Sequence, residues 1–266
     1  MLLTLVMYLV LGAAAGIVAG LFGIGGGILI VPVLVFSFSA QGMSADVLTH
    51  AAVATSLATI IFTSVSSIKA HHSRGAVRWD LFKPLAVGIA IGAVLGAFTA
   101  DLLSGPHLQI IIGVFAFLVA CQMAFGFTPK GRDSELTTPT LAGAGGFIGW
   151  GAAIFGIGGG TLTVPFLTWK KISMQQAVAT SAACGLPIAV MGAVTNIYTG
   201  WNHENVAPYS LGYIYLPAFA GIVISSSLFA KLGAKWAHSL PGDLLKKIFA
   251  AFLFIVSMRF LLANLL

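Results

Sequence analysis

The sequence predicts an all-α, polytopic membrane protein, and three observations carry this prediction. Of the 266 residues, 58% are hydrophobic and only 8% are charged, and the mean hydropathy is +1.01. A soluble domain carries about 25% charged residues, so this chain has too few to cover a water-exposed surface. Apolar runs of roughly 20 residues, long enough to cross a bilayer as helices, recur along the chain. The ~10-residue alternating segments typical of a membrane β-barrel do not occur in the sequence.

The basic residues predict the orientation of the chain in the membrane. All but one of the 13 Lys and Arg residues fall in four connecting segments, within 69–83, 130–132, 170–171 and 231–247. The other connections, SAQGMSAD, DLLSGPH and GWNHENVAP, contain none. Because Lys and Arg gather in cytoplasmic loops, we expect the four basic loops in the cytoplasm and both termini outside, in the inner membrane. The same segregation argues against a nucleic-acid-binding patch as the reason for the net charge of +6.

A glycine-rich block occurs twice. FGIGGGILIVP (Phe22–Pro32) returns as FGIGGGTLTVP (Phe155–Pro165), with nine of the eleven residues unchanged. The pentapeptide AVATS follows each copy, at Ala52–Ser56 and at Ala177–Ser181. Two blocks repeated in the same order indicate an internal duplication of the chain.

The predicted orientation gives the two copies opposite senses across the membrane. We expect two inverted-topology repeats, each a Gly-tipped broken or re-entrant helix hairpin followed by three transmembrane helices, as in many secondary transporters. The first repeat is expected at 1–128, with the hairpin at 2–39 and helices at 46–68, 80–100 and 107–127. A cytoplasmic linker is expected at 129–139. The second repeat is expected at 140–266, with the hairpin at 140–169 and helices at 173–199, 207–230 and 244–266.

The glycine blocks are the first candidate binding site. The arm after each block, Ile28–Phe38 or Thr161–Trp169, would reach only about 14–17 Å as a helix, which places both tips near mid-membrane. Glycine lets a ligand approach the backbone, and consecutive N–H groups at a helix start attract anions. The candidate substrate-binding residues are Gly23, Ile24, Gly25, Gly26, Gly27, Gly156, Ile157, Gly158, Gly159 and Gly160. The alternative interpretation is that these glycines only permit close helix packing.

Polar residues on the following helices extend this site. The further candidates are Thr55, Ser56, Thr180 and Ser181, with His50, Asn196 and Arg259 as accessory residues. Hydroxyls in a span can bind an oxyanion, a neighbouring helix or their own backbone. His50 is either a titratable group of the transport path or a plain interfacial histidine. Arg259 either attracts an anion or extends to the outer interface.

Several function classes are excluded or disfavoured. All seven Asp and Glu residues fall in loops or at helix ends, which disfavours a proton antiporter with a buried carboxylate relay. Neither HExxH nor GxSxG occurs, and GIGGGI matches neither a P-loop nor a dinucleotide fingerprint. We therefore expect no enzyme activity, no catalytic residue, no metal site and no cofactor.

The pattern FGIGGGxLxVP, given twice with AVATS after each copy, resembles the TauE/SafE sulfite exporter family of transmembrane sulfur-compound transporters. The resemblance covers essentially the whole chain. It implies an inner-membrane carrier of sulfur-containing anions, with the family motif on Gly23–Gly27 and Pro32 and on Gly156–Gly160 and Pro165.

We therefore expect a secondary transporter of sulfite or an organosulfonate, working as an exporter. The alternatives are a channel-like anion pore and an importer of another sulfur oxyanion, such as thiosulfate or sulfate. The expected partners are a small anion and the lipid bilayer. Proton coupling and the oligomeric state are left open by the sequence.

Overall fold

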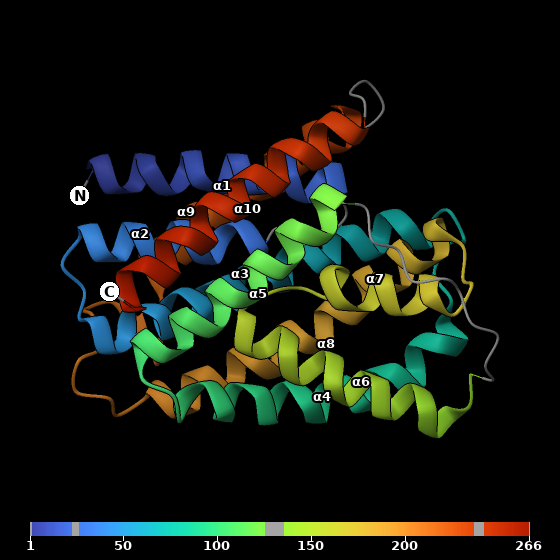
Figure 1. The fold of residues 1–266 in the computed structure, drawn as a ribbon, viewed down its shortest axis with the longest axis horizontal. Helices are drawn as coiled ribbons and strands as arrows, with labels where there is room; N and C mark the ends of the chain where they lie inside the picture. Colours follow the sequence, from blue (N-terminus) through green and yellow to red (C-terminus); the bar gives the residue numbers. More distant parts are fainter. Residues whose placement is uncertain (1, 23–26, 126–135, 237–241, 266) are drawn as a thin grey trace.

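The computed structural model describes residues 2–22, 27–125, 136–236 and 242–265. In these ranges the chain forms ten helices and one two-stranded antiparallel sheet (Figure 1). In order they are α1 (Leu2–Phe22), α2 (Gly27–Ala40), α3 (Ala45–His72), α4 (Trp79–Asp101), α5 (Gly105–Phe125), α6 (Thr138–Phe155), α7 (Gly160–Trp169), α8 (Met174–Gly200), β1 (Ser210–Leu211), β2 (Ile214–Tyr215), α9 (Leu216–Trp236) and α10 (Gly242–Leu265).

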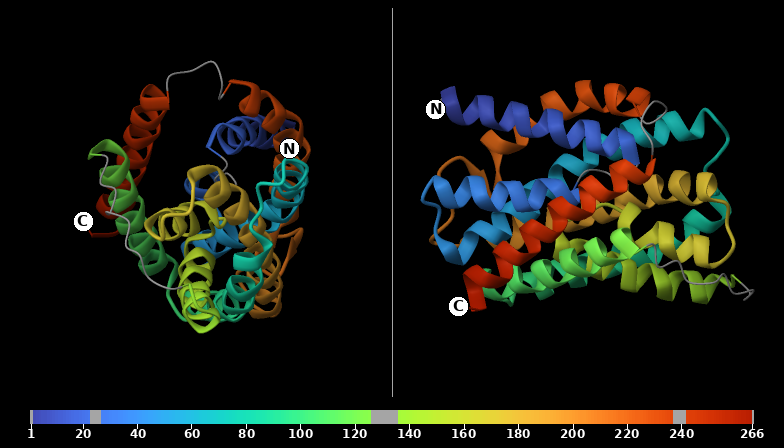
Figure 2. Two further views of the ribbon diagram at one scale, coloured as in Figure 1. Left: turned by 90° about the vertical axis from the view of Figure 1, so that its right-hand side faces the viewer. Right: turned by 45° about the horizontal axis from the view of Figure 1, so that its top comes forward.

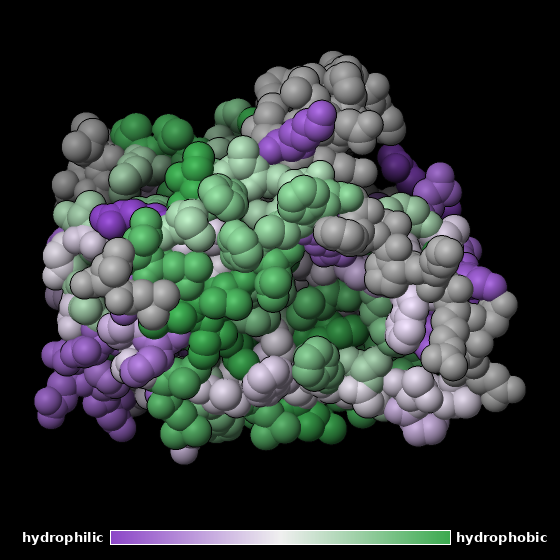
Figure 3. All heavy atoms as spheres, in the orientation of Figure 1, coloured by the Kyte–Doolittle hydropathy of each residue, from purple (hydrophilic) through white to green (hydrophobic). Residues whose placement is uncertain are grey.

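The helices form a polytopic membrane bundle. Four of them, α3, α4, α5 and α8, are long and apolar enough to cross a bilayer, and shorter apolar helices lie within α1, α2, α9 and α10. Large apolar side chains such as Val87, Ile91 and Leu95 on α4 are exposed on the outside of the bundle. On the face seen in Figure 3, apolar residues occupy the middle and hydrophilic residues gather toward the two ends. This pattern suits a hydrocarbon layer around the middle of the molecule.

The bundle has two ends, which we name by a glycine in each. The Gly42 end contains residues 41–44, 102–104 and 201–215, and both chain termini lie on this side (Figure 1). The Gly75 end contains residues 73–78 and 170–173. The views in Figure 2 show the helices running between these two ends. Lys170 and Lys171 lie at the Gly75 end, as do Arg74 and Arg78.

Four helix pairs make the most extensive contacts: α1 with α9, α4 with α6, α5 with α10 and α3 with α8. Small residues allow the close approach of α4 to α6. A Cβ atom placed on Gly92 would overlap the carbonyl oxygen of Gly146, and one on Gly96 would overlap that of Trp150. Because lipid supplies no hydrophobic force between helices, such backbone-to-backbone packing is a main source of association in a bilayer.

Helices α3 and α8 occupy the centre of the bundle. The segment Ala51–Ile60 of α3 is buried throughout, and so is Ala179–Gly185 of α8. Both segments include an AVATS sequence or its end. The duplicated pentapeptides therefore lie in the interior, where their hydroxyl groups need protein or ligand partners.

The predicted helix at 207–230 is wrong in its first nine residues. Residues 207–215 instead form turns and the β1–β2 hairpin, and α9 begins only at Leu216. Tyr209 and Gly212 adopt positive φ angles of 67° and 55°, which an α-helix does not allow. Pro208 also removes a backbone donor at this point. Apolar composition alone does not distinguish this partly buried hairpin from a membrane-spanning helix.

Substituting a glycine of the α4–α6 contact should destabilise the bundle. Gly92→Ala is expected to lower the free energy of unfolding by about 1–3 kcal/mol, because the added methyl group overlaps the Gly146 carbonyl. The matched control is Gly143→Ala in α6, where an added Cβ meets nothing within 4 Å. Thermal denaturation in detergent measures both. Equal melting temperatures for the two variants would contradict this packing.

Candidate functional site

The turn between α6 and α7 is the centre of the candidate site. Helix α6 ends at Phe155, and Gly156 follows in the left-handed conformation with φ 64°. This backbone region strongly favours glycine, so the sequence breaks the helix here. The N–H of Ile157 closes the break by donating to the carbonyl oxygen of Ala152 at 3.0 Å. All residues from Gly156 to Gly160 are buried, and Figure 1 shows the turn midway along the bundle. We call Gly156–Gly160 the second glycine turn.

The start of α2 packs directly against this turn. A Cβ atom on Gly27 would lie 2.7 Å from the carbonyl oxygen of Gly156 and 3.0 Å from the Cα of Ile157. The structure therefore brings Gly27 of the first glycine block against the second block. The other candidates of the first block, Gly23, Ile24, Gly25 and Gly26, lie outside the described residues.

Helix α8 lies equally close on another side. A Cβ atom on Gly159 would lie 2.6 Å from the carbonyl oxygen of Ser181 and 3.0 Å from the nitrogen of Gly185. Gly159 thus has no room for a larger residue unless α8 moves. The predicted candidates Gly156–Gly160 and Ser181 are brought together by this contact.

The two duplicated serines differ in their hydrogen bonds. The hydroxyl of Ser56 donates to the carbonyl oxygen of Gly156 at 2.7 Å, which satisfies an acceptor freed by the helix break. The hydroxyl of Ser181 is buried and has no hydrogen-bond partner within the described ranges. Leaving a buried hydroxyl unpaired costs roughly 1–3 kcal/mol. Ser181 is therefore available to a ligand or a water molecule, whereas Ser56 supports the turn.

Two further unpaired hydroxyls lie on α7, directly after the turn. Thr161 and Thr163 have buried hydroxyl oxygens for which the described part of the chain supplies no partner. Neither threonine is among the site residues predicted from the sequence, although the sequence holds a signal for both. They occupy the two positions at which the second block differs from the first, where Ile28 and Ile30 stand. The hydroxyl of Thr199, farther along α8, is unpaired in the same sense.

The duplicated threonines bind backbone groups. The hydroxyl oxygen of Thr55 accepts the N–H of Tyr215 at 3.0 Å. That of Thr180 accepts the N–H of Arg78 at 3.1 Å. Each threonine thus joins its helix to the residue that precedes another helix, α9 or α4.

The accessory candidates lie apart from these contacts. Asn196 donates to the carbonyl oxygen of Gly192 in its own helix at 2.8 Å. The ring of His50 lies against carbonyl oxygens at the Gly42 end, with Nδ1 3.1 Å from that of Asp46 and Nε2 3.0 Å from that of Ala100. Arg259 is exposed on α10.

The β1–β2 hairpin covers His50. The ring of Tyr213 stacks on that of His50 with centroids 5.3 Å apart, and its hydroxyl donates to a carboxylate oxygen of Asp101 at 3.0 Å. Burial, and then the Asp101 carboxylate, raise the pKa of Tyr213, so the phenol stays protonated and able to donate. The hairpin is thereby fixed to the ends of α3 and α4.

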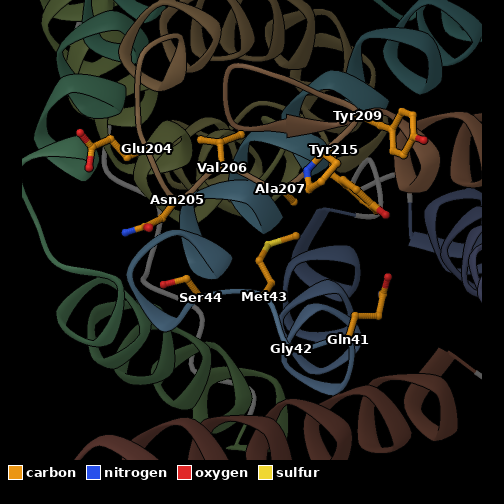
Figure 4. Close-up of a pocket in the computed structure, with 11 residues that line it drawn as sticks. Gln41, Gly42, Met43, Ser44, Glu204, Asn205, Val206, Ala207, Tyr209 and Tyr215 are labelled. Atoms are coloured by element: carbon orange, nitrogen blue, oxygen red, sulfur yellow. The ribbon is translucent and has the colours of Figure 1, made fainter.

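A pocket of about 440 Å³ opens at the Gly42 end, between the α2–α3 connection and the segment before β1 (Figure 4). In that view Gln41 and Tyr215 point toward each other across it. Its lining comprises Gln41, Gly42, Met43, Ser44, Glu204, Asn205, Val206, Ala207, Pro208, Tyr209 and Tyr215. None of these residues belongs to the site predicted from the sequence.

The interior carries almost no formal charge. Within the described ranges, the buried polar side chains are hydroxyls together with His50 and Asn196. No group of three His, Cys, Asp or Glu residues there is arranged to hold a metal ion. The described interior therefore offers hydroxyl and backbone donors, which are suited to an anion that needs hydrogen bonds.

Comparison with known proteins identifies the family. The family model described as "Sulfite exporter TauE/SafE" matches residues 8–260. A "Probable membrane transporter protein" of Haemophilus influenzae is 38% identical over 263 residues, covering 97% of this chain and 98% of the relative. One of Methanocaldococcus jannaschii is 28% identical, covering 98% and 97%, and one of Bacillus subtilis is 30% identical, covering 74% and 80%. No solved structure matches the chain. The chain belongs to the TauE/SafE sulfite exporter family and is a multi-pass membrane transporter, not an enzyme.

Proposed function

We propose that the protein is a secondary transporter that carries sulfite or a small organosulfonate across the cytoplasmic membrane. In this proposal the anion binds at the second glycine turn, with hydroxyls of Ser181, Thr161 and Thr163. The observation that carries it is the group of buried, unpaired hydroxyls on α7 and α8 beside a broken helix.

The chemistry of the turn favours an oxyanion. The first N–H groups of α7 have no carbonyl partner from a preceding helical turn, and the helix dipole adds partial positive charge there. Hydroxyls can donate to sulfonate or sulfite oxygens, while a buried carboxylate, which would repel the anion, is not found among the described interior residues. Donors without a buried lysine bind the anion weakly enough for release.

We also propose the two inverted repeats as the transport framework. Under the exchange of halves, α1 corresponds to α6 and α4 to α9. The α1–α9 contact then corresponds to the α6–α4 contact, and α3–α8 and α5–α10 map onto themselves. This correspondence supports the duplication, with its first unit at 1–128 and its second at 140–266. Because Lys and Arg gather in cytoplasmic loops, we propose that the Gly75 end faces the cytoplasm and the Gly42 end faces outside.

Rocking of one half against the other would expose the site alternately to each face. Export is the proposed direction, following the family's description. Saturable flux with a turnover limit supports a carrier; a conductance far above carrier turnover would favour the channel-like pore instead. Uptake of thiosulfate or sulfate into vesicles would favour the importer.

Removing the Ser181 hydroxyl should weaken substrate binding without weakening the fold. A hydrogen bond to a charged group contributes roughly 1.5–3 kcal/mol, so Ser181→Ala is expected to raise the Kd for the anion by about 10- to 150-fold. Its melting temperature without ligand should not fall below the parent value, because no described partner is lost and a buried unpaired hydroxyl is removed.

The matched control is Ser56→Ala in the other AVATS copy. It removes the donor to the Gly156 carbonyl and should therefore lower the melting temperature. Isothermal titration and thermal denaturation of both variants check the pair. The assignment fails if Ser181→Ala binds the anion as tightly as the parent protein.

A β-branched residue at Gly159 should abolish flux while the protein still inserts. Gly159→Val places a side chain where the Ser181 carbonyl oxygen and the Gly185 nitrogen already lie within 3.0 Å of the Cβ position. Flux in proteoliposomes and the membrane-inserted amount on a blot are the two measurements. Retained flux would count against the second glycine turn as the site.

The substrate itself is tested by ligand stabilisation of the purified protein. Sulfite, sulfoacetate, taurine, thiosulfate and sulfate are compared at equal ionic strength, with chloride as the control anion. A ligand that binds only the folded state raises the melting temperature. Flux of the best ligand in liposomes follows. If none of the five stabilises the protein above chloride, the sulfur-oxyanion proposal is wrong.

A further inference from the structure

The two AVATS threonines make the same hydrogen bond at opposite ends of the bundle. Thr55 accepts the N–H of Tyr215, the last residue before α9, and Thr180 accepts the N–H of Arg78, the last residue before α4. Both threonines are fully buried. Tyr215 belongs to the Gly42 end and Arg78 to the Gly75 end. Thr55 on α3, in the first half of the chain, thus binds the residue before α9 in the second half. Thr180 on α8, in the second half, binds the residue before α4 in the first half.

The Thr55 contact lies between the pocket and the second glycine turn. Tyr215 lines the 440 Å³ pocket (Figure 4), and its ring packs edge-on against Tyr8 and Phe38. Its N–H binds Thr55, and the neighbouring Ser56 binds the Gly156 carbonyl at 2.7 Å. Contacts therefore run without interruption from the pocket to the turn.

The Thr180 contact occupies the corresponding position toward the other end. Arg78 closes the α3–α4 connection, and its guanidinium forms an ion pair at 2.6 Å with Asp80 in the first turn of α4. Thr180 is followed by Ser181, whose carbonyl oxygen lies against Gly159. Each threonine is thus next in sequence to a serine that touches the second glycine turn.

We propose that the Tyr215–Thr55 and Arg78–Thr180 hydrogen bonds are the two gates of the transport path, and that the pocket at the Gly42 end is its outer vestibule. This inference rests on the proposed function, because a gate needs a path. Each bond is a single neutral contact, weak enough to break on transport. Both bonds are present together, so under this proposal both gates are closed in the structure. Alternating access then requires one bond to open while the other holds.

The gates are tested by side-specific labelling of Cys184. This thiol is free and fully buried on α8 beside Gly159, so an impermeant reagent reaches it only when one end opens. A Cys121→Ala background removes the other cysteine of the chain. The probe is a charged methanethiosulfonate applied to either face of oriented membrane vesicles, without substrate.

Thr→Val keeps the side-chain shape and removes the acceptor. Thr55→Val is expected to speed labelling from the face of the Gly42 end, and Thr180→Val from the face of the Gly75 end. Each rate should rise by about 3- to 10-fold, the effect of losing one hydrogen bond on a two-state equilibrium. The control is Thr59→Val on α3, whose hydroxyl donates to the Ser56 carbonyl of its own helix and should change neither rate.

This labelling experiment tests the gate proposal independently of the substrate proposal. Three outcomes would overturn the gates. The labelling rate of Cys184 could rise equally from both faces, it could rise from the face opposite to the one expected, or it could stay at the parent value in both threonine variants. Because no anion is present, a failed sulfur-oxyanion screen leaves this measurement intact. Conversely, anion flux together with labelling that shows no sidedness would retain the transporter and remove the two gates.

Discussion

The structure depends on one constraint: inside a hydrocarbon layer, every backbone polar group that leaves a helix must find a partner within the protein. The break at Gly156 meets this constraint locally and from a distance. The N–H of Ile157 donates to the carbonyl oxygen of Ala152, and the hydroxyl of Ser56 donates to the carbonyl oxygen of Gly156. A break supported in this way can leave other hydrogen-bond donors unpaired, such as the first N–H groups of α7. An anion that has left water can accept hydrogen bonds from such donors.

Close packing provides the second part of that support. Gly27 and Gly159 let α2 and α8 reach the turn, so the two interpretations of the glycine blocks are not exclusive. Together with α3, which contributes Val53 and Ser56, these two helices surround the broken helix and keep lipid away from it. Across the bundle, the α4–α6 glycines hold the stretch Ala142–Trp150 of α6 in place, before that helix ends at Phe155.

Much of the architecture could be predicted because hydropathy and charge report on the bilayer directly. The polytopic helical class and the family followed from composition and from the repeated glycine motif. The β1–β2 hairpin could not be predicted, because its buried residues Tyr213 and Ile214 are hydrophobic, as the residues of a membrane-spanning helix are. Nor could the sequence distinguish the roles of Ser56 and Ser181, because both end the same pentapeptide. The two differ only in the fold, where the Ser56 hydroxyl faces the Gly156 carbonyl and the Ser181 hydroxyl faces no described partner. Thr161 and Thr163 could have been predicted, because they are the two positions at which the second block departs from the first.

The exchange of Ile28 and Ile30 for Thr161 and Thr163 has a thermodynamic consequence. In a transporter built from two identical inverted units, a two-fold rotation would relate the inward-open and outward-open states, so the two would be equally populated. Because α2 carries isoleucines where α7 carries threonines, the two states differ in free energy. In the proposed carrier, the empty protein would therefore favour one side of the membrane even in the absence of a solute gradient.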